Sequence, residues 1–270
     1  MKPEHEISTR DILAFYAEAG VDALVGETPV DRFAEPAPAV ADSSPQQPRG
    51  IARPAVPPRA PSAPIAAPPS PDEAVMAART AAKAAASLKE LRAILERFEG
   101  CALRSTAKQL VFADGNPDAK LMLVGEAPGR DEDIAGLPFV GVSGKLLDLM
   151  LAAIGLDRKS VYIANIVPWR PPGNRDPSLH ETQTCLPFIQ RQIELVDPDI
   201  LVCLGKPSTA ALLGVTDGIK RARGRWLNYS TGKRDIRAMP MYHPAYLLRS
   251  PLEKRYAWRD FLAVKKALGG

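Results

Sequence analysis

The chain has 270 residues, of which 46% are hydrophobic and 24% are charged, and its formal net charge is +4 at pH 7. No apolar run approaches the roughly 20 residues that span a bilayer, and the N-terminus is charged where a signal peptide is apolar. These features argue against a transmembrane or secreted protein, predict a cytoplasmic one and mildly favour a polyanionic partner.

Residues 1–34 are predicted to form a short helical segment. Ser8 and Asp11 resemble a capping box, with Asp in place of Glu. Apolar residues follow at roughly helical spacing, namely Ile12, Leu13, Tyr16, Val21 and Leu24. Two interpretations of this segment stay open: it docks a protein partner on a tether, or it is a dispensable extension that folds back on the main domain.

Residues 35–71 are predicted to be a disordered linker rich in Pro and Ala. Twelve of the 27 prolines lie between Pro36 and Pro71. Such a segment has too little apolar surface to offset its ordering entropy, so we expect it to stay extended. The remaining residues, 72–270, are enough to bury a core and are predicted to form one folded domain.

The domain is predicted to have an α/β fold. A helical stretch from about Asp72 to Phe98 comes first. Apolar runs then predict strands, and the segments between them predict helices; the strands are 120–124, 161–167, 199–204 and 237–242, and the helices are 143–154, 179–196, 206–213 and 252–268. This alternation predicts a three-layer α/β/α sandwich around a central four-stranded, mostly parallel sheet.

Each predicted strand runs into an unusual loop. The four loops are GEAPG at 125–129, PWRPPGNR at 168–175, GKPS at 205–208 and HPAYLLR at 243–249. Sites in such sheets lie beyond the carboxyl ends of the strands, so we expect the loops to meet at one edge. The first loop has neither the Rossmann nor the P-loop spacing, but its backbone N–H groups could bind carbonyls or anions.

Four motifs in this order resemble those of the family 4 uracil-DNA glycosylases, the bacterial and archaeal iron–sulfur type. They read GEAPGRDED, GLPFVGVSGKLLD, NIVPWRPPGNR and HPAYLLR, and the resemblance covers about Phe98 to Leu268. It implies hydrolysis of the N-glycosidic bond of uracil in DNA, the first step of base-excision repair. The target base must be flipped out of the duplex to be reached, so the implied partner is uracil-containing DNA, and a monomer is the default expectation.

The resemblance implies three catalytic residues. Glu132 falls on the family's catalytic carboxylate, near the sugar and the attacking water. His243 falls on the histidine that faces uracil O2, where negative charge develops as the bond breaks. Asn174 falls on a loop asparagine near the sugar or the water, and it could share the water-positioning role with Glu132.

The resemblance also implies a uracil-binding pocket, whose residues are Gly125, Glu126, Ala127, Phe139 and Asn165. Phe139 would stack on the base. Asn165 would read the uracil edge, because a side-chain amide offers both a donor and an acceptor. Glu126 and the 125–129 backbone would shape the pocket and help exclude the methyl group of thymine. Taken alone, Phe139 and Asn165 would be interpreted as core packing and a strand-end hydrogen bond.

Basic residues in and beside the motif loops predict contacts to DNA phosphates, where charge and counterion release favour binding. These residues are Arg170, Arg175 and Arg249. The loop 243–249 would enter the groove, with Leu247 or Leu248 as the wedge that fills the gap left by the flipped base.

The cysteines bear on a possible iron–sulfur cluster. Family members bind a [4Fe–4S] cluster through a C-x2-C pair ahead of GEAPG and a second, wider pair. Here Cys101 matches the second position of the first pair, Phe98 stands at the first, and Cys185 and Cys203 match the second pair. The sequence predicts a cluster held by three thiolates, with His180 as a speculative fourth ligand; the alternative is three unliganded cysteines.

Three other functions are compatible with parts of the sequence to different degrees. A relative that captures uracil-DNA covalently would carry a nucleophilic His on an insertion near the PPGNR motif, and neither is present. A non-catalytic DNA-binding module of the same fold would not need Glu132, Asn165, Phe139 and His243 together. A glycosylase that also acts on hypoxanthine or xanthine stays open.

Overall fold

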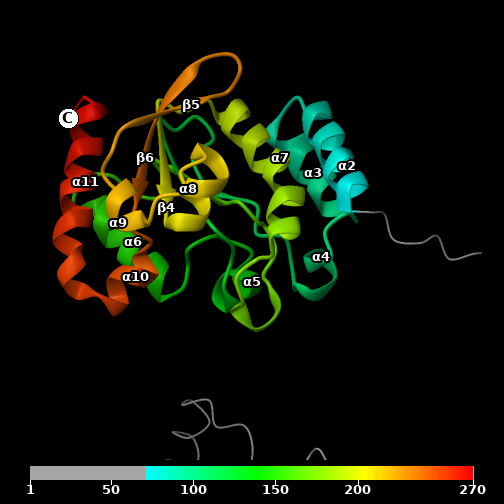
Figure 1. Ribbon diagram of the computed structural model, residues 1–270, viewed down its shortest axis with the longest axis horizontal. Helices are drawn as coiled ribbons and strands as arrows, with labels where there is room; N and C mark the ends of the chain where they lie inside the picture. Colours follow the sequence, from blue (N-terminus) through cyan, green and yellow to red (C-terminus); the bar gives the residue numbers. More distant parts are fainter. Residues whose placement is uncertain (1–70, 270) are drawn as a thin grey trace, which may run out of the picture. The chain divides into compact units, whose positions relative to one another are not determined.

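Figure 1 shows a computed structural model of the chain, which describes residues 71–269. The predicted helical segment 1–34 and nearly all of the predicted linker 35–71 lie outside the described residues. Over residues 71–269, no helix combines the length and the apolar character that crossing a membrane requires.

The described strands form one six-stranded sheet in the order β1-β3-β2-β4-β6-β5. The four central strands run parallel, and they are β3 (Tyr162–Asn165), β2 (Leu121–Gly125), β4 (Ile200–Leu204) and β6 (Asp235–Met241). This confirms the predicted α/β fold. The sheet also has two antiparallel edge strands that the sequence did not predict, β1 (Asp114–Gly115) and β5 (Leu227–Ser230), because neither carries a continuous apolar run.

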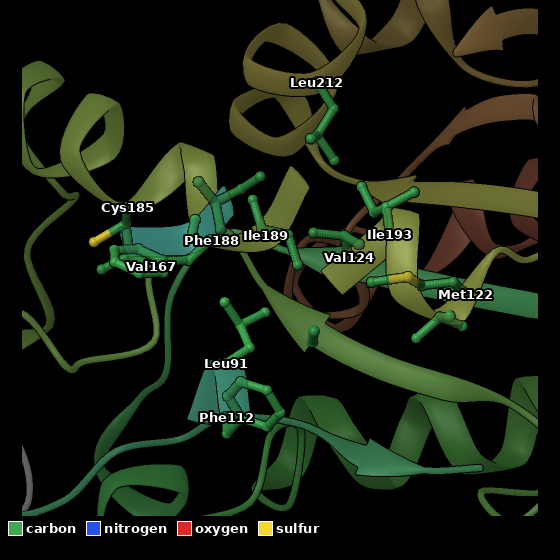
Figure 2. Packing of buried hydrophobic residues seen from close by; sticks show 14 of the residues in the cluster. Leu91, Phe112, Met122, Val124, Val167, Cys185, Phe188, Ile189, Ile193 and Leu212 are labelled. Carbon is green, nitrogen blue, oxygen red and sulfur yellow. The ribbon is translucent and has the colours of Figure 1, made fainter. Parts of the chain in front are cut away.

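One face of the sheet is covered by helices from both halves of the domain. These are α2 (Pro71–Ala84), α3 (Leu88–Arg97), α7 (Leu179–Val196) and α8 (Lys206–Leu213). Figure 2 shows how Phe188, Ile189 and Ile193 of α7 pack with Met122 and Val124 of β2. Since alternate strand residues point to opposite faces, Leu121 and Leu123 are left for the other face.

The other face of the sheet is covered by α6 (Val142–Ala152) and α11 (Lys254–Ala267). Leu147 and Leu151 of α6 pack there with Phe261 of α11 and Leu123 of β2, and all four side chains are buried. Helices on both faces complete the predicted three-layer sandwich, and they leave the carboxyl edge of the sheet to loops and short helices.

The predicted helical stretch 72–98 is broken into α2 and α3. The break has a local cause, because the Ser87 hydroxyl accepts a hydrogen bond from the Glu90 N–H, and the Glu90 carboxylate accepts one from the Ala86 N–H. Ser87 is thus a side-chain N-cap, which starts a new helix, and Glu90 also binds the residue before the cap. Arg191 of α7 donates to the Ala85 carbonyl and so ties the break to the main domain.

Short helices occupy the loops at the strand ends. They are α4 (Leu103–Thr106), α5 (Arg130–Ala135), α9 (Ile219–Ala222), α10 (Pro244–Arg249) and two 3-10 turns at Pro172–Asn174 and Pro251–Glu253. Of these, α5 follows the GEAPG loop and α10 follows β6. Both therefore begin at the carboxyl edge of the sheet, where the motif residues were expected to meet.

Candidate active site

Two neighbouring cavities lie at the carboxyl edge of the sheet. The smaller cavity has a volume of about 190 Å³ and is lined by Ala127, Gly129, Glu132, Phe139, Ser143, Asn165 and His243. The larger cavity has a volume of about 380 Å³; it shares Ala127, Gly129 and His243 with the smaller one and adds Glu126, Asn174 and Arg249. The structure therefore brings four separate sequence motifs to one place, as expected from the strand order.

Gly125 leaves room for the side chains of Asn165 and Phe139 beside the smaller cavity. It is the last residue of β2 and pairs with Asn165, the last residue of β3. A Cβ atom at Gly125 would lie 2.5 Å from Asn165 Oδ1 and 2.6 Å from Phe139 Cζ. A side chain at position 125 would displace the Asn165 amide and the Phe139 ring, so the observed positions of both groups require glycine there.

Asn165 carries an unsatisfied hydrogen-bond acceptor in this cavity. Its side chain is only 5% exposed, and its Oδ1 atom has no hydrogen-bond partner among the described residues. A buried polar atom without a partner is costly. A ligand that places an N–H donor in the smaller cavity would remove this cost.

Phe139 forms an aromatic wall of the smaller cavity. Its ring centroid lies 5.4 Å from that of His243, and the two ring planes are inclined by 32°. The backbone of Phe139 has a φ of 54°, which is the left-handed region that bulky residues rarely adopt. Such conformations cluster at functional sites, where surrounding contacts hold them in place.

His243 is the N-cap of α10 and has a fixed orientation. Its Nδ1 atom accepts a hydrogen bond of 3.1 Å from the Ala245 N–H. Burial, helped by the charge of Arg249 and opposed by that of Glu132, lowers the pKa of His243 to about 4. The imidazole is therefore neutral at pH 7, and because Nδ1 accepts, its proton must be on Nε2.

The carboxylate of Glu132 is bound by three backbone amides. Oε1 accepts from the N–H groups of Val140 and Gly141, each at 2.9 Å, and Oε2 accepts from that of Gly129 at 3.1 Å. The side chain is 7% exposed. Glu132 thus lines the smaller cavity, and its Oε1 atom already binds the loop that carries Phe139.

Glu126 and Asn174 lie together on the wall of the larger cavity. Burial, together with the nearby charge of Asp176, raises the pKa of Glu126 to about 7. The Asn174 Oδ1 atom accepts a hydrogen bond of 2.7 Å from Arg170 Nε. The larger cavity therefore holds a carboxyl group that changes its charge near neutral pH.

The three arginines predicted to contact DNA differ in whether their side chains already have a partner within the protein. Arg175 makes a two-pronged ion pair with Glu181, with N–O distances of 2.8 and 2.6 Å. The Arg170 side chain donates to Asn174, whereas the Arg249 guanidinium, which lines the larger cavity, makes no hydrogen bond or ion pair with residues 71–269. Arg249 is thus the guanidinium of this group that is available to an incoming anion.

Leu247 is not available as a wedge, which corrects one of the two alternatives from the sequence. It is 0% exposed and packs with Tyr242 and Ala257 beneath α10. Leu248, the next residue, is 38% exposed. Consecutive helical residues point about 100° apart, and the sequence could not tell which of the two faces the core.

Two residues of the site were missed by the sequence analysis. Ser143 lines the smaller cavity, and its position in the VSGK stretch at the start of α6 was the available signal. Arg158 donates to the backbone carbonyls of Pro138 and Phe139 from a connection without any motif. No signal in the sequence marks Arg158, since its partners lie 19 and 20 residues away.

Two of the three cysteines lie close together, and the third is not grouped with them. The Sγ atoms of Cys101 and Cys185 lie 3.8 Å apart, with Cys185 as the donor, and both residues are buried. Cys203 lies in β4 on the same face of the sheet, but residues 71–269 contain no group of three possible metal ligands, so His180 completes none. Phe98 instead packs its ring edge-on against Phe188, with centroids 5.0 Å apart.

The chain was also compared with known proteins. A family profile described as the uracil DNA glycosylase superfamily matches residues 112–262. The type-4 uracil-DNA glycosylase of Saccharolobus solfataricus is 40% identical over 179 residues, which are 64% of this chain and 83% of that protein. The corresponding protein of Archaeoglobus fulgidus is 39% identical over 173 residues (63% and 87%), and that of Thermotoga maritima is 38% identical over 157 residues (58% and 80%).

Proposed function

The chain belongs to the uracil DNA glycosylase superfamily, and from this membership we propose that it removes uracil from DNA by hydrolysing the bond between the base and deoxyribose. The observation that carries the proposal is the unpartnered Asn165 Oδ1 atom in a cavity of about 190 Å³ beside Phe139. In this cavity a flipped base could hydrogen-bond to the Asn165 amide and stack on the Phe139 ring.

Asn165 distinguishes uracil from cytosine through its amide. Uracil presents an N–H donor at position 3 and a carbonyl at position 4, so its N3–H satisfies Oδ1 while the Asn165 amide nitrogen donates to O4. Cytosine presents an acceptor at position 3 and an amino group at position 4, so both contacts become repulsive. A site built to hydrogen-bond one pattern rejects the other strongly, because its buried groups are left unpaired.

The methyl group of thymine must be excluded by the walls of the smaller cavity. Glu126, which the sequence suggested for this role, lines the larger cavity and not the smaller one. We therefore assign the exclusion to Ala127, Gly129 and Glu132, which line the smaller cavity.

His243 stabilises the leaving base. Negative charge develops on uracil O2 as the glycosidic bond breaks, and the neutral imidazole donates a hydrogen bond to it from Nε2. Because Nδ1 is fixed by the Ala245 N–H, the donor is oriented before the substrate arrives. Such preorganised donors act on the transition state without further rearrangement.

Different residues act on the deoxyribose and on the attacking water. The negative charge of Glu132 stabilises the positive charge that develops on the deoxyribose, although its oxygens are held by backbone amides. Water is bound in the larger cavity by Asn174 and Glu126. Of these two side chains, the ionised Glu126 carboxylate is the one that accepts a proton from the water.

DNA binds over the larger cavity. Arg249 attracts a phosphate, because it lines this cavity and has no ion pair within residues 71–269. Leu248 of the same helix is half exposed and fills the space that the flipped base leaves. Arg170 and Arg175 keep their intramolecular partners and contribute positive charge near the backbone.

The residues present do not fit the four-cysteine cluster that the family resemblance implies. Two thiols lie together, Cys203 is not gathered with them, and Phe98 fills the place of the fourth ligand against Phe188. A cluster held by three cysteines would require the Cys101–Cys185 pair and Cys203 to approach one another, and it stays a prediction. No step of the reaction is derived through it.

The remaining assignments follow from the proposed substrate. We propose that the chain acts as a monomer in the cytoplasm, where its DNA substrate lies and thiols stay reduced. Residues 72–270 are the catalytic domain, and residues 1–34 dock a protein partner through the linker 35–71. Because α2 begins at Pro71 and Ala74 is buried, deletion of residues 1–70 should leave excision from a naked oligonucleotide intact.

The proposal is tested with a single-stranded oligonucleotide that carries one uracil, followed by alkali treatment and a denaturing gel. The same strand with thymine or cytosine in place of uracil is run alongside, together with Asn165→Ala. Cleavage at uracil alone, with a large loss in the variant, supports the glycosylase. Specific binding of the uracil strand without cleavage would replace it by a binding module.

A further inference from the structure

Arg158 lies outside every motif, yet its side chain reaches the loop that carries Phe139. It stands in the connection between α6 and β3 and is 23% exposed. Nη1 donates to the Pro138 carbonyl at 3.1 Å, and Nη2 donates to the Phe139 carbonyl. We infer that Arg158 is a positioning residue for uracil excision, which fixes the Pro138–Phe139 backbone so that the Phe139 ring faces the base.

Arg158 is itself held in one orientation. Nη1 also donates to Asp114 Oδ2 at 2.6 Å, and Nε donates to Asp148 Oδ1 at 2.7 Å. The two carboxylates come from β1 and α6, so the guanidinium is fixed to two different elements of the sandwich. A planar fork of donors can hold this many acceptors at once, whereas the single ammonium of lysine cannot.

Glu132 binds the same loop through its backbone N–H groups. Arg158 binds the carbonyl groups of Pro138 and Phe139, and Glu132 binds the N–H groups of Val140 and Gly141. Four consecutive residues are therefore bound through their backbone by two side chains of opposite charge. The loop follows α5 and precedes α6, and its only side chain that lines the smaller cavity is that of Phe139.

The conformation of Phe139 explains why this loop needs to be held. Its φ of 54° is unfavourable for a bulky residue and persists only where neighbours enforce it. A Cβ atom at Gly144 would overlap the Phe139 carbonyl oxygen, so α6 packs directly against the group that Arg158 binds. Without Arg158, the carbonyl would lose its partner and the backbone could relax, moving the ring.

The inference rests on the proposed function, and it predicts that Arg158 acts through Phe139. The test measures single-turnover excision of uracil by the full chain and by Arg158→Ala, Arg158→Lys, Phe139→Ala and the double variant Arg158→Ala/Phe139→Ala. Misplacement of a substrate-positioning group by about 1 Å costs on the order of 100-fold in rate. We expect a loss of about 10- to 100-fold for Arg158→Ala and a smaller one for Arg158→Lys.

The double variant separates positioning from general destabilisation. If Arg158 acts through the Phe139 ring, the double variant should be slower than Phe139→Ala by no more than about 2-fold. The effects of residues that act as a unit on the rate are not additive. Multiplicative losses would overturn the inference. Should Arg158→Ala fail to fold, Asp148→Asn, which weakens one anchor of the guanidinium, replaces it in the same cycle.

Arg191 provides a matched control. It is 19% exposed, and like Arg158 it donates to a carboxylate, that of Glu194, and to a carbonyl, that of Ala85. It lies on α7 and contacts neither cavity. Arg191→Ala should lower the melting temperature but keep the excision rate within about 2-fold, whereas rate losses that simply follow melting temperature in both variants would overturn the inference.

A second readout does not depend on turnover. Binding of DNA with a non-hydrolysable 2′-fluoro-deoxyuridine should be weakened by Arg158→Ala and by Phe139→Ala to the same extent, with no further loss in the double variant. A wild-type chain that binds this DNA but never excises uracil rejects the proposed function alone. A wild-type chain that excises uracil normally, with unaltered analogue binding in Arg158→Ala, rejects the inference alone.

Discussion

The ring of His243 lies 5.4 Å from the ring of Phe139, although one residue follows β6 and the other precedes α6. Both rings line the smaller cavity, and burial keeps His243 neutral. Its function as a hydrogen-bond donor to uracil O2 therefore depends on a proton that stays on Nε2 across the physiological range.

The pH profile of excision should reflect the low pKa of His243. Since protonation sets in only near pH 4, His243 should contribute no fall in rate near pH 6.5, the usual pKa of histidine, and the rate of Glu126→Gln should be flat there. His243→Ala should lose about 100- to 1,000-fold, as expected for removal of a preorganised donor. A rate that falls tenfold between pH 7 and pH 6 only in the protein with His243 would contradict a neutral donor.

The same histidine should make folding sensitive to acid. The unfolded chain binds a proton on His243 near pH 6.5, but the folded chain does so only near pH 4. The free energy of unfolding therefore falls as the pH drops through this window. Urea unfolding at pH 7 and pH 5 should show a smaller difference for His243→Asn than for the unchanged protein.

Glu126 should set the rate near neutral pH. Its pKa of about 7 is raised by burial and by Asp176, and the proposed water activation needs the ionised form. Excision should therefore rise with pH through about 7 and reach a plateau above it. Glu126→Gln should be slow and lack this rise, and Asp176→Asn should shift the rise to lower pH. A profile unchanged in Asp176→Asn would speak against Glu126 as the titrating group.

Asn165 should show opposite effects on activity and stability. Its unpartnered Oδ1 is costly in the free protein, so Asn165→Ala should leave the free energy of unfolding unchanged or raise it. A typical core substitution lowers it by about 1 kcal/mol. Excision of uracil should fall strongly, because the base loses its edge reader. Chemical denaturation with single-turnover kinetics checks both effects, and a parallel loss of stability and rate would contradict this role.

The fold could be predicted from the sequence where apolar runs were long, and it could not where they were short. The ends of α7 at Leu179 and Val196 match the prediction, because Ser178 and Glu181 form a capping box that the sequence displays. By contrast, β1 has two residues, and β5 alternates between exposed and buried positions. Such strands are defined by pairing with a neighbour, which a single sequence does not reveal.

The sequence motifs named several residues that line one cavity, but they did not reveal the contacts that hold these residues in place. The motifs named Asn165, Phe139 and His243, which line one cavity. They did not indicate that Glu132 is bound by three amides, because Val140 and Gly141 lie eight and nine residues away in the chain. The side chain that supports Phe139 from outside the motifs, Arg158, could be found only from the folded backbone.

The iron content should distinguish the cysteine arrangements. Because Phe98 stands where the family resemblance expects a cysteine and packs on Phe188, protein purified without oxygen should hold less iron and sulfide per chain than Phe98→Cys. Elemental analysis and the visible absorbance of an iron–sulfur cluster measure this. A full cluster in the unchanged protein, lost in Cys203→Ala, would instead establish the three-cysteine form.

Leu247 and Leu248 should separate folding from base flipping. Leu247 is buried and Leu248 is half exposed on the same helix. Leu247→Ala should lower the free energy of unfolding by about 2–5 kcal/mol, as for a deleted core side chain. Leu248→Ala should leave it nearly unchanged but slow excision from duplex DNA, where the gap must be filled, and much less from a single strand. Equal slowing on both substrates would show that Leu248 does not act as a wedge.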